Sequence, residues 1–286
     1  MNEARVDRSR GVMAGLAIGD ALGAGYEFDS YMEDYEAVYM KGGGIFNWEP
    51  YQWTDDTSMA IPIAKAVEDG RDLLDPLTIE EIYQEWREWH WTAPDVGNQT
   101  RSILSTAKTH DEAIDLGKHQ YERNPLRVGG NGCVMRTAPI ALACLDDLSE
   151  LVAAASLYAS LTHPDPLAIQ SAINWTVSIA VAVNYKEWPV DINRKSLLAP
   201  RYYSASNGKA DHAVRAAIAS IRYGKGEVVP SLEAAIRGGG DTDTVAAIAG
   251  ALIGAVHGLG AFPTDWVRKV HGWPGLQLLD LPTVRI

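Results

Sequence analysis

Apolar residues recur along most of this chain at helical spacing, mixed with alanine and glycine, while alternating β-branched runs are almost absent. Val12, Leu16 and Leu22 show the pattern near the N-terminus. Further helical segments are predicted over 61–67, 79–90, 99–108, 135–145, 151–161, 167–184, 213–223, 229–237 and 244–257. Small residues on a helix surface let helix axes approach closely, so we expect an all-α fold, one compact bundle with short connections. Residues 1–286 are predicted to form a single domain.

The segment 11–23 is unusual for a helix because it holds four glycines in thirteen positions. Each glycine costs about 1 kcal/mol relative to alanine in a helix interior. Close packing or a nearby ligand must therefore compensate. Asp20 and Glu27 lie in and after this segment, and as isolated acids we interpret them as solvated or capping residues.

Composition limits where the protein works and what it binds. The formal net charge is −12, which argues against broad nucleic-acid binding, since Lys and Arg must neutralise phosphates. Cys133 and Cys144 are the only cysteines, too few for a disulfide scaffold or a thiolate zinc site, and this usage fits a reducing cytoplasm. The polar N-terminus is unlike a signal peptide, and the weakly polar run 245–256 is shorter than the roughly 20 residues that cross a bilayer. We expect a soluble, cytoplasmic protein.

Two acidic motifs stand directly before predicted helices, WTDDT at 53–57 and GGDTDT at 239–244. For either motif alone, an ordinary N-terminal cap is a sufficient interpretation. One cap needs one acceptor, however, and each motif supplies two carboxylates, which repel each other unless a cation compensates. Carboxylates and threonine hydroxyls without His or Cys favour Mg²⁺, Mn²⁺ or Ca²⁺ over zinc or copper. If the two helix starts converge, they could hold two ions about 3.5–4 Å apart.

Two further features have both a ligand-binding and a plain structural interpretation, and for His163 alone the structural one is favoured. The glycine-rich loop 128–136 could bind a diphosphate through its backbone amides, although a structural turn explains it too. It is neither a dinucleotide fingerprint nor a Walker A loop, because no strand precedes it and no Gly-Lys-Ser/Thr follows. His163 stands between the end of one predicted helix and Pro164, where it could simply cap the helix.

Taken together, the order of these motifs resembles the ADP-ribosylglycohydrolase family, which includes the dinitrogenase-reductase-activating glycohydrolases and the eukaryotic ADP-ribosylhydrolases. The resemblance covers about residues 11–258. Its motifs are 15–23 with Glu27, 53–57, 97–100, 130–136, 161–163 and 239–244. The segment 186–208 matches nothing specific in the family.

The resemblance implies an orthogonal helical bundle whose central cleft holds two Mg²⁺ or Mn²⁺ ions. The metal ligands that it implies are Thr54, Asp55, Asp56, Asp241, Asp243 and Thr244. Glu27 would lie on a mobile loop and gate the site. The residues implied to line the ADP-ribose groove are Gly97, Asn131, Gly132, Cys133, Met135 and His163, with the loop amides on the diphosphate.

The activity we predict is hydrolysis of the α-glycosidic bond between ADP-ribose and a protein side chain, with arginine favoured and serine or an O-acyl ester as alternatives. Asp55 or Asp56 would orient the attacking water, Asp243 would act with them mainly as a ligand, and Glu27 would regulate access or assist the leaving group. Two other hypotheses remain: a metal-dependent phosphohydrolase acting on the diphosphate, and a non-catalytic ADP-ribose binder. The predicted partner is an ADP-ribosylated protein, no membrane is expected, and a monomer is the simplest state.

Overall fold

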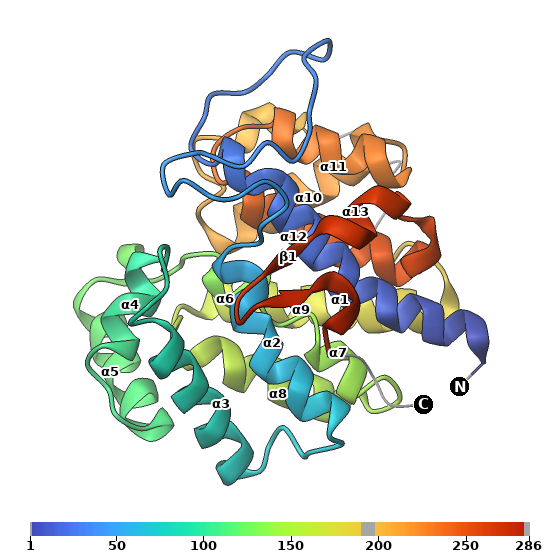
Figure 1. Cartoon of the computed structure of the whole chain (residues 1–286). Helices are drawn as coiled ribbons and strands as arrows, with labels where there is room; N and C mark the ends of the chain where they lie inside the picture. Colours follow the sequence, from blue (N-terminus) through green and yellow to red (C-terminus); the bar gives the residue numbers. More distant parts are fainter. Residues whose placement is uncertain (1, 190–197, 283–286) are drawn as a thin grey trace.

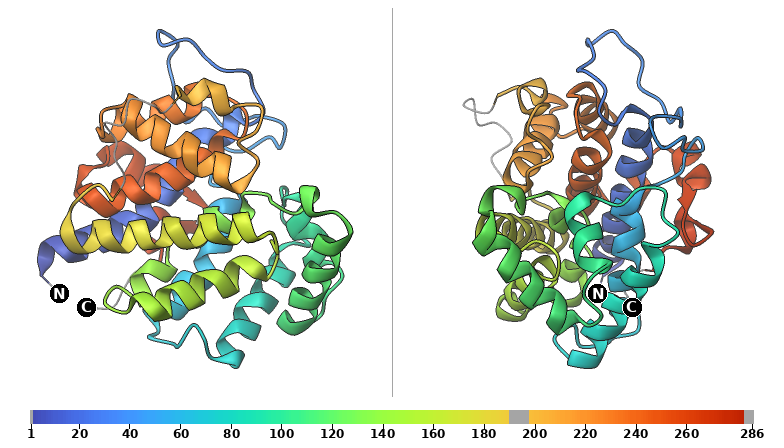
Figure 2. Two further views of the ribbon diagram at one scale, coloured as in Figure 1. Left: turned by 180° about the vertical axis from the view of Figure 1, so that it is seen from behind. Right: turned by 90° about the vertical axis from the view of Figure 1, so that its left-hand side faces the viewer.

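The computed structural model describes residues 2–189 and 198–282, and within these ranges the fold is all-α, as predicted (Figure 1). The helices are α1 (Glu3–Gly23), α2 (Asp55–Glu68), α3 (Pro76–Trp89), α4 (Asn98–Leu104), α5 (His110–Arg123), α6 (Gly132–Met135), α7 (Ile140–Ala143), α8 (Leu148–Ser160), α9 (Pro166–Tyr185), α10 (Ala210–Tyr223), α11 (Val228–Arg237), α12 (Thr242–His257) and α13 (Thr264–Lys269). Strands β1 (His271–Gly272) and β2 (Leu276–Gln277) form a short antiparallel hairpin. Helices α3–α5 lie at one end of the molecule and α10–α11 at the other (Figure 2).

The antiparallel pair α1 and α12 forms the centre of the bundle. The glycines of α1 at 11, 15 and 19 face Gly254, Gly250 and Ala246 of α12 in turn. A Cβ at Gly15 would clash with the carbonyl oxygen of Gly250, and a Cβ at Gly250 would clash with that of Gly15. Close packing therefore offsets the helical cost of these glycines. We call this contact the glycine seam.

The glycine seam also decides where the acidic residues lie. At its last step, a Cβ on Gly23 would lie 2.6 Å from the carbonyl carbon of Thr242. Because the two helices are antiparallel, this contact sets the C-terminal end of α1 beside the N-terminal end of α12. The acidic motif that opens α12 is thus fixed next to the segment that carries Glu27.

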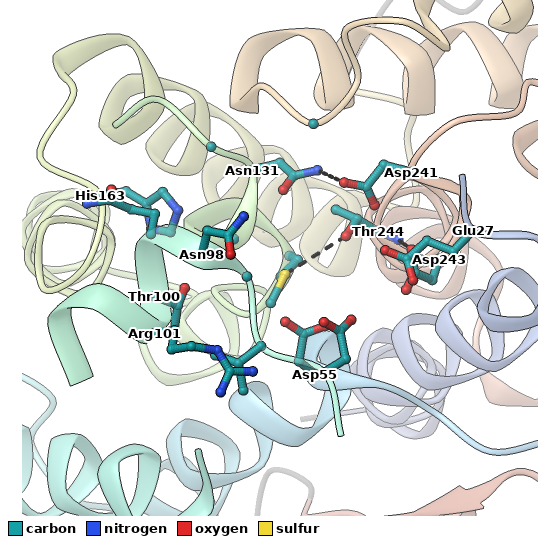
Figure 3. A pocket seen from close by; sticks show the side chains of 18 of the residues that line it. Glu27, Asp55, Asn98, Thr100, Arg101, Asn131, His163, Asp241, Asp243 and Thr244 are labelled. Carbon is teal, nitrogen blue, oxygen red and sulfur yellow. Dashed lines mark hydrogen bonds between the residues drawn. The ribbon is translucent and has the colours of Figure 1, made fainter. Parts of the chain in front are cut away.

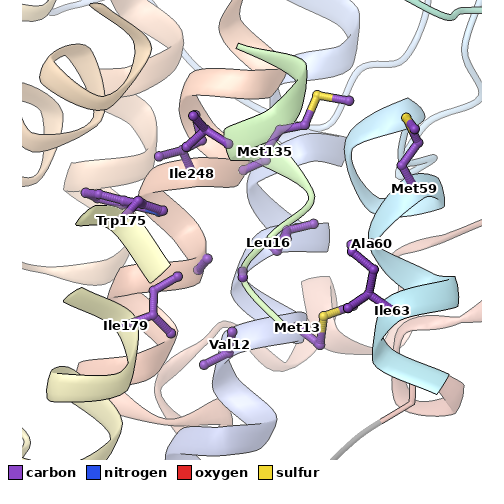
Figure 4. Close-up of a cluster of buried hydrophobic side chains, with 14 of the residues drawn as sticks. Val12, Met13, Leu16, Met59, Ala60, Ile63, Met135, Trp175, Ile179 and Ile248 are labelled. Atoms are coloured by element: carbon purple, nitrogen blue, oxygen red, sulfur yellow. The ribbon is translucent and has the colours of Figure 1, made fainter. Parts of the chain in front are cut away.

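The hydrophobic core surrounds the glycine seam (Figure 4). Leu16 of α1 and Ile248 of α12 are buried together with Trp175 of α9 and Met59 of α2. Helix α9 is long and apolar enough to cross a membrane, but half of its most apolar window is buried, and it packs against α8, α10 and α12. It is therefore a longer apolar helix than the run 245–256 that the sequence singled out.

Three sequence expectations are corrected by the structure. The predicted helix 135–145 is divided into α6 and α7, since Pro139 has no amide to donate to a continuous helix. The predicted helix 99–108 ends as α4 at Leu104. Helix α5 was not predicted because its fully buried residues are only Ala113 and Gly117, with Ile114 and Leu116 partly buried, so its apolar stripe is weak.

Candidate metal centre and substrate pocket

The two acidic motifs meet in one cavity of about 550 Å³ (Figure 3). The cavity lies where α2, α4, α6 and α12 begin, with the loop after α1 at its rim. Its lining residues include Glu27, Phe28, Phe46, Asp55, Asp95, Gly97, Arg101, Arg127, Asn131, Gly132, Met135, His163, Asp241, Asp243 and Thr244. Tertiary packing thus joins segments that are far apart in the chain.

Asp243 is at the centre of the carboxylate cluster. Asp243 belongs to three groups, with Asp20 and Asp56, with Glu27 and Asp241, and with Asp55 and Asp95; within each group one oxygen per residue lies within 4.8 Å of the others. The predicted threonines join this cluster. Thr54 Oγ1 lies 3.2 Å from Asp56 Oδ2 and 3.4 Å from Asp243 Oδ2, and Thr244 Oγ1 lies 3.3 Å from Asp56 Oδ2.

The cluster has the properties of a cation site. Burial, reinforced by the neighbouring carboxylates, raises the pKa of Asp55, Asp56 and Asp243 well above the usual range and that of Glu27 to about 9. Two acceptor atoms, Asp56 Oδ1 and Glu27 Oε2, are buried without a hydrogen-bond partner among the described residues. Carboxylate and hydroxyl oxygens suit Mg²⁺ or Mn²⁺, so the residues present fit such an ion.

Asp20 is fully buried, so the solvated interpretation is wrong and the capping one is confirmed. Its carboxylate accepts hydrogen bonds from the amides of Thr54 (2.8 Å) and Thr57 (2.9 Å) and from the Thr57 hydroxyl (2.6 Å). Burial raises its pKa to about 6. Asp20 of α1 therefore caps α2 from another helix and fixes the first turn that carries Asp55 and Asp56.

Asp95 is an acid of the site that the sequence analysis missed. It precedes α4, and burial, together with the charge of Asp241, raises its pKa to about 6. Its only signal in the sequence is its place two residues before Gly97, where the 97–100 motif begins. A carboxylate oxygen of Asp95 lies within 4.8 Å of oxygens of Asp55 and Asp243, so the three could share one metal ion.

Asn207 was also missed, and it belongs to the segment 186–208 that matched nothing. Its Oδ1 accepts from the amide of Asp241 (3.1 Å), and its Nδ2 donates to the carbonyl of Gly239 (2.9 Å). Its own carbonyl accepts from Asn131 Nδ2 (2.9 Å), which also donates to Asp241 Oδ2 (2.8 Å). Asn207 thus connects the glycine-rich loop to the acidic motif of α12. Within the segment 186–208, residues 190–197 lie outside the described residues.

Five of the six predicted groove residues line the pocket: Gly97, Asn131, Gly132, Met135 and His163. His163, Asn98 and Arg101 face the carboxylates across the cavity (Figure 3). Cys133 is an exception: its side chain is fully buried, with Sγ near the carbonyls of Gly130 and Ala168, so it reaches no ligand in the pocket. The amide of Asn131 is bonded to the carbonyl of Gly208 (3.1 Å), which removes it from the amides available to a diphosphate.

The loop that carries Glu27 is held against the start of α12. The Phe28 amide donates to the carbonyl of Gly240 (2.7 Å), and the Gly240 amide donates to the carbonyl of Asp29 (3.0 Å). Phe28 has a φ of 64°, a left-handed conformation that a bulky residue adopts at an energetic cost. These bonds offset that cost; Glu27 is buried, whereas Phe28 is 61% exposed at the pocket rim.

Comparison with known proteins supplies an independent line of evidence. The sequence profile of the ADP-ribosylglycohydrolase family matches residues 1–284. An ADP-ribosylarginine hydrolase of Pseudomonas putida is 32% identical over 97% of this chain and 78% of its own length. The ADP-ribosyl-[dinitrogen reductase] glycohydrolase of Rhodospirillum rubrum is 27% identical over 92% of this chain and 90% of its own.

A solved structure gives the same result for the fold. A chain of an ADP-ribosylglycohydrolase-related protein complex superposes with a TM-score of 0.71, at 27% identity, over 94% of both chains. Sequence and structure comparisons therefore agree over almost the whole length.

Proposed function

Since the chain belongs to the ADP-ribosylglycohydrolase family, we propose that it removes ADP-ribose from modified arginine side chains of proteins, with a divalent metal centre in this pocket. The observation that carries the proposal is the convergence of both acidic motifs on Asp243, opposite a wall of hydrogen-bond donors. One side suits cations, and the other suits the oxygens of ADP-ribose.

The choice of arginine rests on the rim of the pocket as well as on the relatives. An arginine acceptor is a planar cation, which aromatic faces and carboxylates attract. The exposed ring of Phe28 adjoins Glu27 at the rim, and Phe46 also lines the cavity. A serine or ester acceptor carries no such charge and would gain less from this surface. The relative from Pseudomonas putida is named for the arginine linkage.

The metal ligands would be Thr54, Asp55, Asp56, Asp241, Asp243 and Thr244. A divalent ion bound there would polarise oxygen ligands and lower the pKa of a bound water. Asp55 lines the pocket, whereas Asp56 is fully buried and accepts from two threonine hydroxyls. Asp55 is therefore the residue of the pair that is placed to take a proton from the attacking water.

In the proposed reaction, the water oxygen bonds to the anomeric carbon while the bond from that carbon to the guanidinium nitrogen breaks. The proton that leaves the water is taken up at Asp55, and the departing guanidine gains one proton from Glu27 or solvent, so charge balances. Glu27 lies at the pocket wall beside Phe28 and is positioned for this role. Arg101 and Arg127 provide local positive charge for the diphosphate in an otherwise acidic protein.

The proposal is tested by assaying the purified protein with Mg²⁺ or Mn²⁺ on ADP-ribose linked to arginine, to serine, through an ester and to nucleic acid. We expect intact ADP-ribose and free arginine, with activity lost in EDTA and restored by either metal. AMP and ribose phosphate would identify the phosphohydrolase alternative. Binding of ADP-ribose without turnover of any substrate would identify a non-catalytic binder.

We further propose that the protein acts as a monomer in the cytoplasm. All residues assigned to the reaction come from one chain, so a second copy adds nothing that the pocket requires. Light scattering during size-exclusion chromatography measures the mass directly, and a dimer would contradict the proposal.

A further inference from the structure

Arg136 is a fully buried cation behind the pocket. Among the described residues it forms no ion pair with a carboxylate. Its guanidinium carbon lies 4.3 Å from the centre of the Trp86 ring, and Nη1 lies 3.8 Å from Met59 Sδ. Nη2 donates to the carbonyl of Tyr158 (3.1 Å) and to Thr162 Oγ1 (2.6 Å). The charge of Asp55 acts on Arg136 from a distance, but a cation buried at this cost with no carboxylate in contact among the described residues calls for an explanation.

The hydrogen bonds of Arg136 fix the direction of the next one. A guanidinium has donors only, so the Thr162 hydroxyl must accept from Arg136. Thr162 Oγ1 also lies 2.7 Å from His163 Nδ1. Thr162 is fully buried, and among the described residues His163 Nδ1 is the acceptor within hydrogen-bond distance of its single proton. If the hydroxyl accepted from an Nδ1–H as well as from Arg136, that proton would be buried without an acceptor. In the neutral ring, the proton of the imidazole is then carried by Nε2.

The Nε2 edge of His163 faces the glycine-rich loop and the pocket. A Cβ at Gly130 would lie 3.1 Å from Nε2, and a Cβ at Gly132 would lie 3.0 Å from Cε1. Neither glycine has a positive φ, so these two positions provide space for the imidazole and not an unusual backbone. Burial, together with the charge of Arg136, lowers the pKa of His163 to about 3, which keeps the ring neutral.

We propose that Arg136 and Thr162 are positioning residues that hold His163 as the neutral tautomer with its Nε2–H directed into the pocket. There it donates a hydrogen bond to an acceptor oxygen of the substrate. The identity of that substrate as an ADP-ribose conjugate rests on the proposed function, whereas the tautomer does not. The arrangement supplies a fixed, uncharged donor beside the loop, and the buried charge of Arg136 polarises it through Thr162.

The direct test is nitrogen NMR of the wild-type protein labelled at histidine, with His163 assigned by its loss in His163→Gln. We expect an unprotonated Nδ1 and a protonated Nε2 at neutral pH. A protonated Nδ1 would overturn the proposal. This measurement needs no turnover, so it stands apart from the outcome of the hydrolase assay, and it does not depend on a variant that must fold well.

The variant Thr162→Val keeps the shape of the side chain but removes the donor to Nδ1. We expect affinity for free ADP-ribose to fall about five- to tenfold, the value of one hydrogen bond, with a mixture of His163 tautomers and an unchanged kcat. Thr162→Ser keeps the hydroxyl and should retain both the affinity for ADP-ribose and the single tautomer of His163. The matched control is Thr176→Val, a buried threonine of α9 bonded to the Ala172 carbonyl and to Thr137. Wild-type ADP-ribose affinity in Thr162→Val would contradict the proposal.

Discussion

The two walls of the pocket are built from opposite chemistry. One wall, which we call the acid wall, gathers the carboxylates of Glu27, Asp55, Asp95, Asp241 and Asp243. The facing donor wall presents Asn98, Arg101, Arg127 and His163. A net charge of −12 therefore describes neither wall. The proposed function needs this local arrangement, with cations on one side of the cavity and an anionic ligand on the other.

The walls also differ in what holds them in place. The acid wall is fixed by the backbone packing of the glycine seam, which aligns α1 with α12, and by the cap that the Asp20 side chain provides for α2. The donor wall has no such backbone packing, and His163 in it is held by the side-chain hydrogen bonds of Arg136 and Thr162. Substitutions in the acid wall should abolish the metal centre and with it turnover. Substitutions in the donor wall should each weaken the binding of ADP-ribose by a limited amount.

Breaking the acid wall at its centre should have the largest effect. Asp243→Asn removes a charge from all three carboxylate groups, so turnover should fall by more than the roughly 100-fold typical of losing an outer-shell partner. Release of ADP-ribose from modified arginine measures this. Affinity for free ADP-ribose, which the donor wall also supports, should change less than turnover. Turnover like that of the wild type would refute the role of the acid wall.

The glycine seam offers a second way to break the acid wall. Gly15→Ala drives a Cβ into the Gly250 carbonyl and should lower the free energy of unfolding by about 3 kcal/mol, as overpacking does. Urea denaturation measures the change. The control is Gly117→Ala in α5, where the nearest atom would lie 3.5 Å from the new Cβ. It should stabilise the protein by about 0.5–1 kcal/mol, and equal effects of the two variants would contradict the argument.

The stability contributed by the acids and by His163 should depend on pH in opposite directions. The folded pKa values of Asp20 and Asp95 (about 6) and Glu27 (about 9) are raised, so without metal their contribution to stability is lost as pH rises through those values. His163, with a lowered pKa of about 3, has the opposite sign and loses stability below about 6.5.

A cation binds the ionised acids, so the increase in Tm on adding Mg²⁺ or Mn²⁺ should grow between pH 6.5 and 8.5. At 100-fold over the Kd it should reach about 5–10 °C. Differential scanning fluorimetry with and without EDTA measures it. An increase that shrinks as pH rises would contradict a carboxylate site.

The smallest effect is expected from Arg127, an exposed residue of the donor wall. Arg127→Ala removes one exposed guanidinium from the pocket and should raise the KM for ADP-ribosylarginine about three- to fivefold, with kcat unchanged, since a solvated charge contributes modestly. Added salt should reduce the difference from wild type. Lys118→Ala, an exposed lysine of α5 away from the pocket lining, serves as the control. A loss of kcat instead would assign Arg127 to the reaction itself.

Much of the fold was predictable because its signals are local. Apolar spacing indicated most of the helices, and the two acidic motifs do stand at the starts of α2 and α12. The break between α6 and α7 follows from Pro139, a local signal that the apolar pattern concealed. Helix α5 was missed because its fully buried residues, Ala113 and Gly117, are small and give a weak apolar signal. Asp95 and Asn207 were missed for a different reason, because each acts through contacts with residues far away in the chain.

The sequence by itself determined the helical class, the oxygen-rich chemistry of both acidic motifs and the need to compensate the glycines of α1. Only the tertiary structure decided that packing compensates them, that the motifs meet at Asp243, and that Asp20 is buried. It also placed Thr162 between Arg136 and His163, the arrangement from which we infer the tautomer of His163. Helix propensity and capping act between near neighbours, whereas carboxylate clustering and hydrogen-bond direction depend on distances that exist only after the helices pack.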